Sequence, residues 1–377
     1  MEPLLIDIRK DSLINVLQLV LKAVSHNNLI PVLAGICIEV HTTEIVFTTS
    51  NTSMTIQYRV SQDSDSLIIY RTGGIVVPAR YFIEVIRKLN EGLIIFEVNQ
   101  GLILTIISGS SQIRLQGMDP GEFPSINKDY PMNAKFRINN SLLKSTIRQV
   151  AIAASSSEAR PVLTGVSFDY NNDYLRLVVT DGIRLASRTI YTENNWNNNT
   201  KILIPAQNLY EISKLLKNDD DTTEIVTFAN QVRFTTNELK IDSVLIDGVF
   251  PSIMNIIPKG YISEVLLESN LLLRAVECVS VLAGESIIKL ATTTCALALF
   301  SQTADIGEIQ NEIPLIEMEG EDFNISLNGK LLVDLLRSIE SEKIRIRFTG
   351  KVSPIILIPE DIDSSTLFLI TPVRTHN

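Results

Sequence analysis

Apolar residues recur at helical spacing in six segments of the chain. In the first, residues 8–25, they form one face of an amphipathic helix, at Leu13, Val16, Leu17, Val20, Leu21 and Val24. The other five candidate helices are residues 78–90, 140–160, 206–217, 268–280 and 327–338. Two of the helices begin at or after a proline, Pro78 or Pro205, which is tolerated in a first helical turn.

Short runs rich in β-branched residues separate the helices and predict strands. Examples are residues 45–49, 102–107, 175–179 and 344–348. The last of these alternates apolar and basic residues, which suits a sheet with one buried and one solvated face. Each third of the chain has the order strand, helix, several strands, second helix, further strands. This order predicts the α+β class, with two helices packed on an antiparallel sheet in each third.

Four short motifs occur twice at nearly constant spacing. Pro31-Val-Leu-Ala-Gly35 returns 130 residues later as Pro161-Val-Leu-Thr-Gly165. The other three return 127, 131 and 127 residues later: Val77-Pro-Ala79 as Ile204-Pro-Ala206, Asn99-Gln100 as Asn230-Gln231, and Gly121-Glu-Phe-Pro-Ser-Ile126 as Gly248-Val-Phe-Pro-Ser-Ile253. A weaker third copy begins near Asn270-Leu271. We therefore predict three tandem domains, residues 1–128, 129–258 and 259–377.

Charge is distributed unevenly along the chain. There are 33 lysines and arginines against 43 aspartates and glutamates, so the net charge is −10. The six candidate helices together carry +7, and five of them are positive, so the rest of the chain carries −17. This balance argues against a uniformly basic coat on nucleic acid. A single positive helix is usually an ordinary solvated face, whereas positive helices repeated on an acidic protein suit a ring around a polyanion.

Residues for catalysis or metal binding do not form a recognisable set. The histidines at positions 26, 41 and 376 give no HExxH motif and no cluster at zinc spacing. Gly329-Lys330 lacks the rest of a P-loop, and Asp219-Asp-Asp221 has the composition of a solvated turn. We therefore predict a protein that is not an enzyme and that uses no cofactor or metal.

The cysteines and the N-terminal residues indicate a reducing compartment. Cys37, Cys278 and Cys295 are far apart and flanked by apolar residues, as expected for free and buried thiols. The first residues lack the pattern of a signal peptide, and the longest run of hydrophobic-class residues is six, 295–300. We expect a soluble cytoplasmic protein without a membrane partner.

Four motifs resemble those of a known family, the bacterial sliding clamp, which is the beta subunit of DNA polymerase III. They are Ser-Ser-Ser-Glu-Ala-Arg-Pro-Val-Leu-Thr-Gly at 155–165, Thr180-Asp-Gly-Ile-Arg-Leu-Ala186, Asp247-Gly-Val-Phe-Pro-Ser252 and Pro372-Val-Arg-Thr375. The resemblance covers essentially the whole chain and is nearest to clamps of Gram-positive bacteria. It implies three clamp domains per chain and a head-to-tail homodimer closed as a ring around duplex DNA. The implied function is to tether DNA polymerase and other replication and repair proteins, which confers processivity.

The resemblance also implies two protein-binding sites and a DNA-facing surface. A pocket between the second and third domains receives short apolar motifs of the DNA polymerase III alpha subunit, the clamp loader and other proteins. Its counterparts here are Leu163, Thr180, Gly182, Ile183, Arg184, Leu185, Pro251, Ile256, Asn328, Leu331, Leu369, Thr371, Pro372, Val373 and Arg374. The candidate residues facing DNA are Lys22, Arg80, Arg87, Lys88, Lys144, Arg148, Lys214, Lys217, Arg274, Lys330 and Arg337. At the protomer interface, Val281 and Leu282 would meet Ile113 and Leu115 of the second copy.

The sequence departs from the family pattern at several of these places. The family usually has histidine where Ile183 stands and methionine or leucine where Thr371 stands, so the peptide preference should differ. A basic residue expected near the duplex is missing around Asn27, and the loop 283–286 near the protomer interface is short. These departures suggest a divergent second clamp whose ring is weaker or self-selective.

Two alternatives belong to other functional classes. A clamp-like decoy would bind the peptide motifs of clamp partners but would stay off circular DNA. An enzyme on a triplicated scaffold would need a cleft with strongly perturbed titratable groups, for which the sequence offers no candidate.

Overall fold

The order of elements expected from the sequence is confirmed in every third of the chain. The computed structural model describes residues 4–25, 30–63, 65–99, 101–124, 131–171, 173–191, 200–253, 256–293, 295–360 and 365–374. The first third contains β1 (Leu4–Arg9), α1 (Lys10–Val20), β2 (Gly35–Val40), β3 (Glu44–Ser50), β4 (Met54–Ser61), β5 (Leu67–Arg71), β6 (Gly73–Pro78), α2 (Ala79–Lys88), β7 (Leu93–Asn99), β8 (Ile103–Ser108) and β9 (Ser111–Gln116).

The other two thirds repeat this order. The second contains β10 (Ala134–Asn139), α3 (Asn140–Ala151), β11 (Gly165–Tyr170), β12 (Tyr174–Thr180), β13 (Arg184–Tyr191), β14 (Thr200–Pro205), α4 (Ala206–Leu215), β15 (Thr222–Thr227), β16 (Gln231–Thr235) and β17 (Leu239–Val244). The third contains β18 (Ser263–Glu268), α5 (Ser269–Ser280), β19 (Ile287–Thr292), β20 (Ala296–Thr303), β21 (Gly307–Pro314), β22 (Glu317–Gly320), β23 (Asn324–Asn328), α6 (Gly329–Arg337), β24 (Lys343–Phe348), β25 (Ile355–Pro359) and β26 (Ser365–Ile370).

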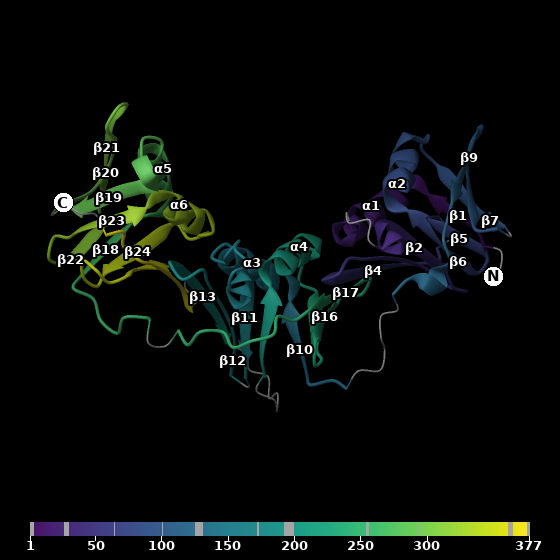
Figure 1. The fold of residues 1–377 in the computed structure, drawn as a ribbon, viewed down its shortest axis with the longest axis horizontal. Coiled ribbons are helices and arrows are strands. Elements are labelled where there is room, and N and C mark those ends of the chain that lie inside the picture. The colour runs from purple at the N-terminus through teal and green to yellow at the C-terminus, as the bar shows by residue number, and fades with distance from the viewer. Residues whose placement is uncertain are drawn as a thin grey trace. The chain divides into compact units, whose positions relative to one another are not determined.

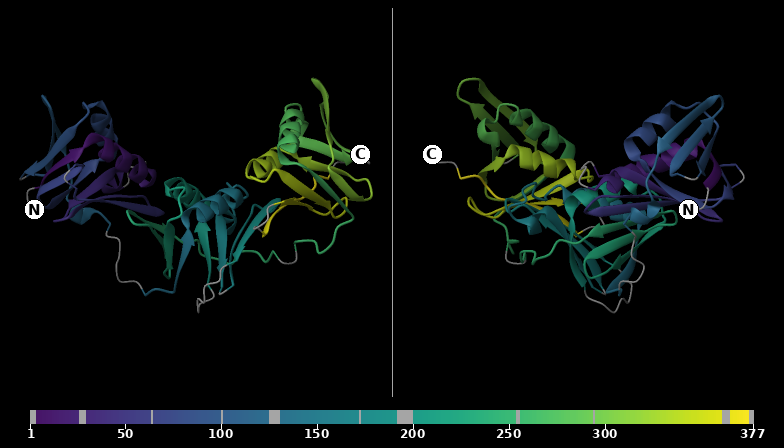
Figure 2. Two further views of the ribbon diagram at one scale, coloured as in Figure 1. Left: turned by 180° about the vertical axis from the view of Figure 1, so that it is seen from behind. Right: turned by 45° about the vertical axis from the view of Figure 1, so that its right-hand side comes forward.

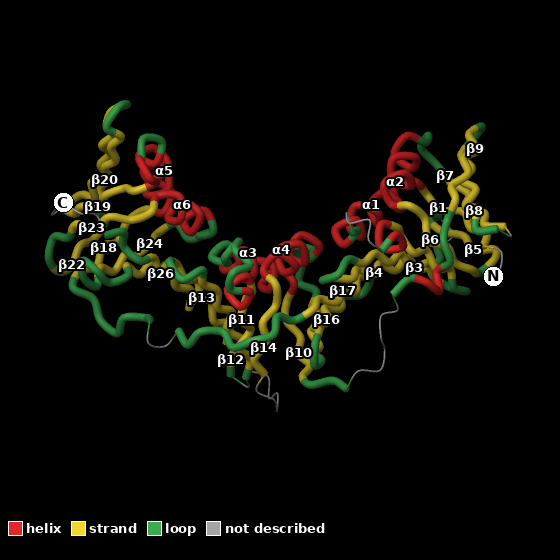
Figure 3. The backbone as a smooth tube through the Cα atoms, in the orientation of Figure 1, coloured by secondary structure: helices red, strands yellow, loops and turns green. Residues whose placement is uncertain are grey.

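The chain forms two compact units. Unit 1 comprises residues 1–141 and 214–245, and unit 2 comprises residues 142–213 and 246–377. Unit 1 holds the sheets β5-β1-β7-β8-β9 and β10-β15-β16-β17-β4-β3-β2-β6, and unit 2 holds β14-β11-β12-β13-β26-β25-β24-β18-β22 and β21-β20-β19-β23. Helices α1 and α2 pack together in unit 1, as α5 and α6 do in unit 2 (Figure 1, Figure 2). Figure 3 shows each of these pairs on one face of its strands.

The two large sheets continue from one sequence repeat into the next. In unit 1, β4 of the first repeat pairs antiparallel with β17 of the second, with Ile56 opposite Ile241. In unit 2, β13 of the second repeat pairs antiparallel with β26 of the third, with Leu185 opposite Leu369. Neighbouring repeats therefore share a sheet, and a repeat does not close its own sheet as a separate barrel or sandwich would.

Steric crowding explains why the strongest repeat motifs contain glycine and proline. Gly35 lies opposite Pro78 at the end of the β2–β6 pair, and Gly165 lies opposite Pro205 in the same place of the second repeat. A Cβ on Gly35 would stand 2.5 Å from a methyl carbon of Val76, and one on Gly165 would stand 2.8 Å from Leu203. No side chain fits at that distance, so glycine is required in both copies.

The observed helix bounds reduce the positive charge expected on the helices. Helix α1 ends at Val20 and α3 ends at Ala151, so the predicted segments 8–25 and 140–160 are too long. Within the observed bounds only α2, α3 and α6 carry net positive charge. Lys10 of α1 is buried, and its ammonium donates to Leu89 O at 2.7 Å and to Glu91 Oε1 at 2.9 Å. The prediction that five of the six helices are positive is therefore wrong.

The cysteines also differ from expectation. Cys37 on β2 is buried, and burial raises the pKa of its thiol. Cys278 and Cys295 are exposed, so the prediction of burial is wrong for both. Cys278 lies on α5 between Glu277 and Val279, and neighbours along a helix point in different directions, so one apolar neighbour does not imply a buried position.

One carboxylate of unit 2 lies among several arginines. Glu264 on β18 is buried and accepts from Arg345 at 2.9 Å and from Arg347 at 2.5 Å, and Arg345 also pairs with Glu360. Burial by itself raises the pKa of Glu264, but the hydrogen bonds from Arg347 and Arg345 outweigh it and hold the pKa below its ordinary value. The ionised carboxylate therefore stabilises the fold.

The Glu264→Gln variant should be less stable than the wild type at pH 7 by about 2 kcal/mol, because both arginines lose a charged partner. Because the pKa of Glu264 is lower in the folded than in the unfolded protein, its carboxylate stabilises the fold fully above the pKa of the unfolded protein. This stabilisation is lost as the pH falls through the pKa of the folded protein. The difference between the two proteins should therefore shrink below about pH 4. Urea unfolding at pH 7 and pH 3 measures it, with Glu319→Gln on the neighbouring strand as a control. A difference that stays constant between these pH values would contradict the prediction.

Candidate functional site

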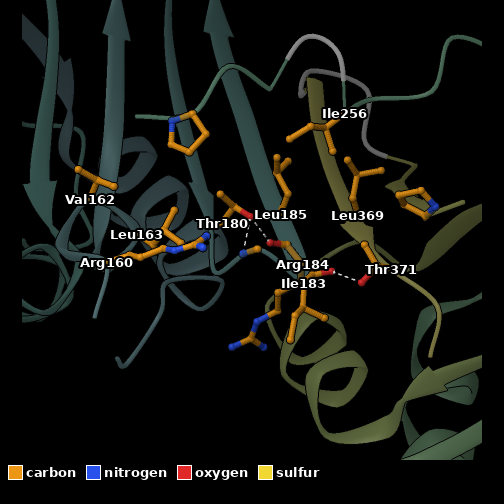
Figure 4. Close-up of a pocket in the computed structure, with 13 residues that line it drawn as sticks. Arg160, Val162, Leu163, Thr180, Ile183, Arg184, Leu185, Ile256, Leu369 and Thr371 are labelled. Atoms are coloured by element: carbon orange, nitrogen blue, oxygen red, sulfur yellow. Dashed lines mark hydrogen bonds between the residues drawn. The ribbon is translucent and has the colours of Figure 1, made fainter. Parts of the chain in front are cut away.

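Unit 2 contains a pocket of about 180 Å³ where β13 begins and β26 ends. It is lined by Arg160, Val162, Leu163, Thr180, Gly182, Ile183, Arg184, Leu185, Pro251, Ile256, Pro354, Leu369 and Thr371. Figure 4 shows side chains arriving from the two hydrogen-bonded strands, from the turn between β12 and β13, from the segment before β11 that carries Arg160, Val162 and Leu163, and from the loop that carries Ile256. The pocket is thus built from the second repeat, the third repeat and the segment between them.

The floor of the pocket is apolar because residues of a hydrophobic cluster form it. Leu185 and Leu369 are partners across the β13–β26 pair, and both are buried. The cluster continues behind them through Val178, Leu203, Phe250 and Ile356. Such a floor offers apolar contact area and few polar partners, which favours an apolar ligand side chain.

The polar groups on the pocket wall are already paired within the chain. The Thr180 hydroxyl donates to Arg184 O at 2.6 Å and accepts from Gly182 N at 3.1 Å. Asp181 Oδ1 accepts from the backbone N–H groups of Ile183 and Arg184 at 2.8 and 2.9 Å. Gly182 has a φ of 94°, in the left-handed region that favours glycine. The turn 180–184 is therefore fixed by its own side chains.

Arg184 is buried in this wall. The exposed fraction of its side chain is 8%, Nε lies 3.0 Å from Asp181 Oδ2, and Nη1 lies 3.0 Å from Asp334 Oδ2 on α6. Figure 4 shows its guanidinium beside a helix below the pocket and away from the apolar floor. Both ion pairs are internal, so acids of the chain itself hold the guanidinium of Arg184.

The opening of the pocket has a different character. Ile183 and Ile256 are 50% and 43% exposed, so apolar surface continues out of the pocket. Arg160 is exposed at the rim and has no acidic partner among the described residues. Sequence reasoning did not assign Arg160, Val162 or Pro354 to the site, although Arg160 and Val162 stand inside one of the motifs singled out there.

Ten of the fifteen residues predicted for peptide binding line this one pocket. The other five are Asn328 and Leu331, at the start of α6, and Pro372, Val373 and Arg374, which follow the lining residue Thr371 in sequence. Asn328 caps α6 by accepting from Leu331 N at 3.1 Å, and Leu331 O accepts from Arg184. Thr371 N and its hydroxyl donate to Ile183 O, and Val373 N donates to Ser326 O at 2.8 Å. The C-terminal segment is thereby held against the pocket turn and against β23.

The equivalent place in unit 1 has the same backbone but different side chains. Asn51 holds the turn before β4 through two backbone N–H groups, as Asp181 does in unit 2. The pair that corresponds to Leu185 and Leu369 is Thr55 and Asp242, and Asp242 is bound to Arg233 at 2.7 Å. A threonine and an ion-paired aspartate stand where unit 2 has two leucines, so this junction has no comparable apolar floor.

Comparison with known proteins identifies the family of the chain. Three family descriptions match in order: the N-terminal, central and C-terminal domains of the DNA polymerase III beta subunit, at residues 4–127, 137–252 and 254–374. The chain belongs to the family of bacterial sliding clamps. It is 33% identical to the beta sliding clamp of Bacillus subtilis over 376 residues, and 32% identical to that of Staphylococcus epidermidis over 375, covering 98% of this chain and 99% of each relative.

Solved structures of sliding clamps have the same fold as this chain. The sliding clamp of Bacillus subtilis superimposes with a TM-score of 0.93 at 32% identity, covering 99% of this chain and 100% of that one. A sliding clamp of Pseudomonas aeruginosa bound to griselimycin gives a TM-score of 0.91 at 26% identity. The chain is thus a processivity subunit of DNA polymerase III and not the subunit that performs catalysis.

The cations expected to face DNA are all on helices or at helix ends. Lys22 lies just after α1, Lys217 just after α4, and the others lie within α2 to α6; all are exposed except the half-buried Lys144. Arg80 pairs with Glu84 within α2, Lys217 pairs with Glu238, and Arg337 pairs with Glu277 of α5. Several of these cations are thus partly neutralised by acids of the chain itself.

The residues expected at the protomer interface are available on the surface of each unit. Ile113 and Leu115 are half-buried on β9, which is an edge strand of its sheet in unit 1. Val281 follows α5 in unit 2 and is 76% exposed, and Leu282 beside it is half-buried. The short loop that follows contains a single 3-10 turn, Gly284–Ser286. The position of Asn27 lies outside the described residues, as does that of Thr375.

Neither metal sites nor membrane spans appear in the part of the chain that the structure describes. No group of three His, Cys, Asp or Glu side chains there could hold a metal ion. Asp219, in the acidic run singled out from the sequence, instead accepts a hydrogen bond from the Asn140 side chain at 2.9 Å. None of the described helices is long and apolar enough to cross a bilayer.

Proposed function

We propose that two copies of this chain join head to tail into a ring around duplex DNA and carry replication and repair proteins on the pocket of unit 2. The observation that carries this proposal is the pocket, which gathers ten of the residues that the sequence predicts for peptide binding. Its dry floor suits the apolar anchor residues of a short peptide. The peptides would come from the DNA polymerase III alpha subunit, the clamp loader and other proteins with clamp-binding motifs.

The three family matches support domain boundaries near residues 128 and 258, which we retain as part of the proposal. A protein that acts on the chromosome of a bacterium works in the cytoplasm, so we assign the chain to that compartment. We interpret the departures from the family pattern at Ile183 and Thr371 as changes in peptide preference. We interpret the short 283–286 loop as a change in the strength of the ring.

The helices would contact phosphates without reading base edges, because lysine and arginine at helix surfaces offer charge but no pattern of base contacts. Exposed cations without an internal acidic partner among the described residues, such as Arg148, Arg274 and Lys330, are the strongest candidates.

Replacing Arg148, Arg274 and Lys330 together by glutamine should weaken binding to a DNA duplex and reduce its salt dependence. Each lost phosphate contact lowers the magnitude of the slope of log K against log salt concentration by about 0.9. The slope of the triple variant should therefore be smaller than that of the wild type by between about 2 and 3. Fluorescence anisotropy with a labelled duplex at several salt concentrations measures the slope. The control replaces Lys201, Lys343 and Lys351, three exposed lysines outside the helices. Equal slopes for the wild type and the helix variant would remove these residues from the DNA surface.

Retention on circular DNA tests the function as a whole. The protein is incubated with nicked circular DNA, a cognate clamp loader and ATP, and half of the sample is then linearised. We expect retention on circles and release from linear ends, which only a topological link produces. A protein that never stays on circles, while a control clamp loads, would instead be a decoy that binds clamp partners away from DNA.

A further inference from the structure

The pocket turn is attached to helix α6 through a single guanidinium. Arg184 Nη1 contacts Asp334 Oδ2 at 3.0 Å and reaches Leu331 O at 3.5 Å, and both acceptors belong to α6. On its other side Arg184 Nε contacts Asp181 Oδ2 at 3.0 Å. The same arginine therefore joins the turn that forms the pocket wall to a helix of the third repeat.

Helix α6 is a rigid support for this contact. Its N-terminus is capped by the Asn328 side chain, and Leu332, Val333, Leu335 and Leu336 are buried in the body of unit 2. Asp334 lies between two of these buried residues, so its backbone is held in place, and its side chain is half-buried with an exposed fraction of 39%. A carboxylate held in this way can fix the orientation of the guanidinium that it binds.

The position of the Arg184 guanidinium in turn affects the positions of the two neighbouring residues that line the pocket. Arg184 is followed by Leu185, which forms the pocket floor, and preceded by Ile183, which forms the rim. Without Asp334 the buried guanidinium would keep only one carboxylate partner, and it would have to move toward another partner or toward water. Either movement would displace the turn that forms the pocket wall.

We propose that Asp334 is a positioning residue of the pocket: through Arg184 it fixes the turn 180–184 in the geometry that accepts an apolar peptide side chain. This inference rests on the proposed function of the pocket as the peptide site. Asp334 itself lies outside the pocket lining, and its contribution would be indirect, through the orientation of Arg184.

Measurement of peptide affinity tests the proposal. The probe is a fluorescein-labelled peptide that carries the clamp-binding motif of the cognate DNA polymerase III alpha subunit, and the readout is fluorescence anisotropy with the full-length chain. Asp334→Asn should bind this peptide about tenfold more weakly than the wild type. Asp334→Glu, which can still reach the guanidinium, should recover part of the loss. The matched control is Glu277→Gln, which removes the carboxylate partner of Arg337 on the same pair of helices but does not contact the pocket.

A double-mutant cycle with Arg184→Met separates positioning from a general loss of stability. If Asp334 acts through Arg184, adding Asp334→Asn to Arg184→Met should cost no further affinity. The double variant also carries no unpaired buried charge from this pair, so it remains informative if Asp334→Asn alone folds poorly.

Two results would overturn the proposal: affinity of Asp334→Asn within twofold of the wild type, or an equal loss from Asp334→Asn in the presence and absence of Arg184. Failure of the proposed function is a different outcome, because the wild type itself would then not bind the peptide.

Discussion

Ile256→Asp is expected to lower the affinity of the chain for a clamp-binding peptide by about 100-fold. Ile256 lines the pocket and is 43% exposed, so the fold should tolerate a polar residue there while the pocket does not. The new carboxylate would have to lose water against the apolar floor when a peptide side chain enters. Fluorescence anisotropy with the labelled polymerase peptide measures the effect.

Val249→Asp is the matched control, because Val249 belongs to the same connecting segment, is 90% exposed and lies outside the pocket lining. Its affinity should equal that of the wild type. If Ile256→Asp bound the peptide as well as this control does, the peptide site would have to lie elsewhere on the chain. Val373 is a less direct probe than Ile256, because it lies beside the pocket and not in its lining.

Val281→Asp is expected to convert the dimer to monomers at concentrations where the wild type is fully dimeric. Val281 is 76% exposed in the single chain, so aspartate there costs the monomer little. In the proposed interface the side chain meets apolar residues of the second copy, and an unpaired charge buried there raises the dissociation constant by about 100-fold or more. Sedimentation equilibrium gives the dimer constant, and retention on circular DNA should fall in parallel.

Val352→Asp provides the comparison, since Val352 is 74% exposed and stands in the turn between β24 and β25, which is not part of the proposed interface. It should leave both the dimer and its retention on DNA unchanged. A Val281→Asp protein that remained dimeric would exclude the end of α5 from the interface.

The fold could be predicted largely because the first and second repeats share the same glycine and proline at positions where the strands pack closely. Gly35 and Gly165 have no room for a side chain, and each lies opposite a proline that ends a strand, so the motif survives in both copies. The third repeat was harder to detect for the same physical reason. There Ile287 lies opposite Asn328, and Asn328 caps the helix with its side chain, so neither glycine nor proline marks the position.

The pocket residues could be named only through the motifs that resemble the clamp family, because an apolar strand residue by itself predicts ordinary core. The pairing of Arg184 with Asp334 joins residues 150 positions apart and leaves no local pattern in the sequence. The exposure of Cys278 and the burial of Lys10 were missed for a related reason. Both depend on which way a helix faces and on contacts made far along the chain.

The sheets that run from one repeat into the next have a mechanical consequence. Each junction between repeats inside the chain is a ladder of backbone hydrogen bonds, at β4–β17 in unit 1 and at β13–β26 in unit 2. Pulling such a ladder apart breaks many backbone hydrogen bonds at once. In a ring of two copies that opens to admit DNA, these ladders would therefore keep neighbouring repeats of one chain joined.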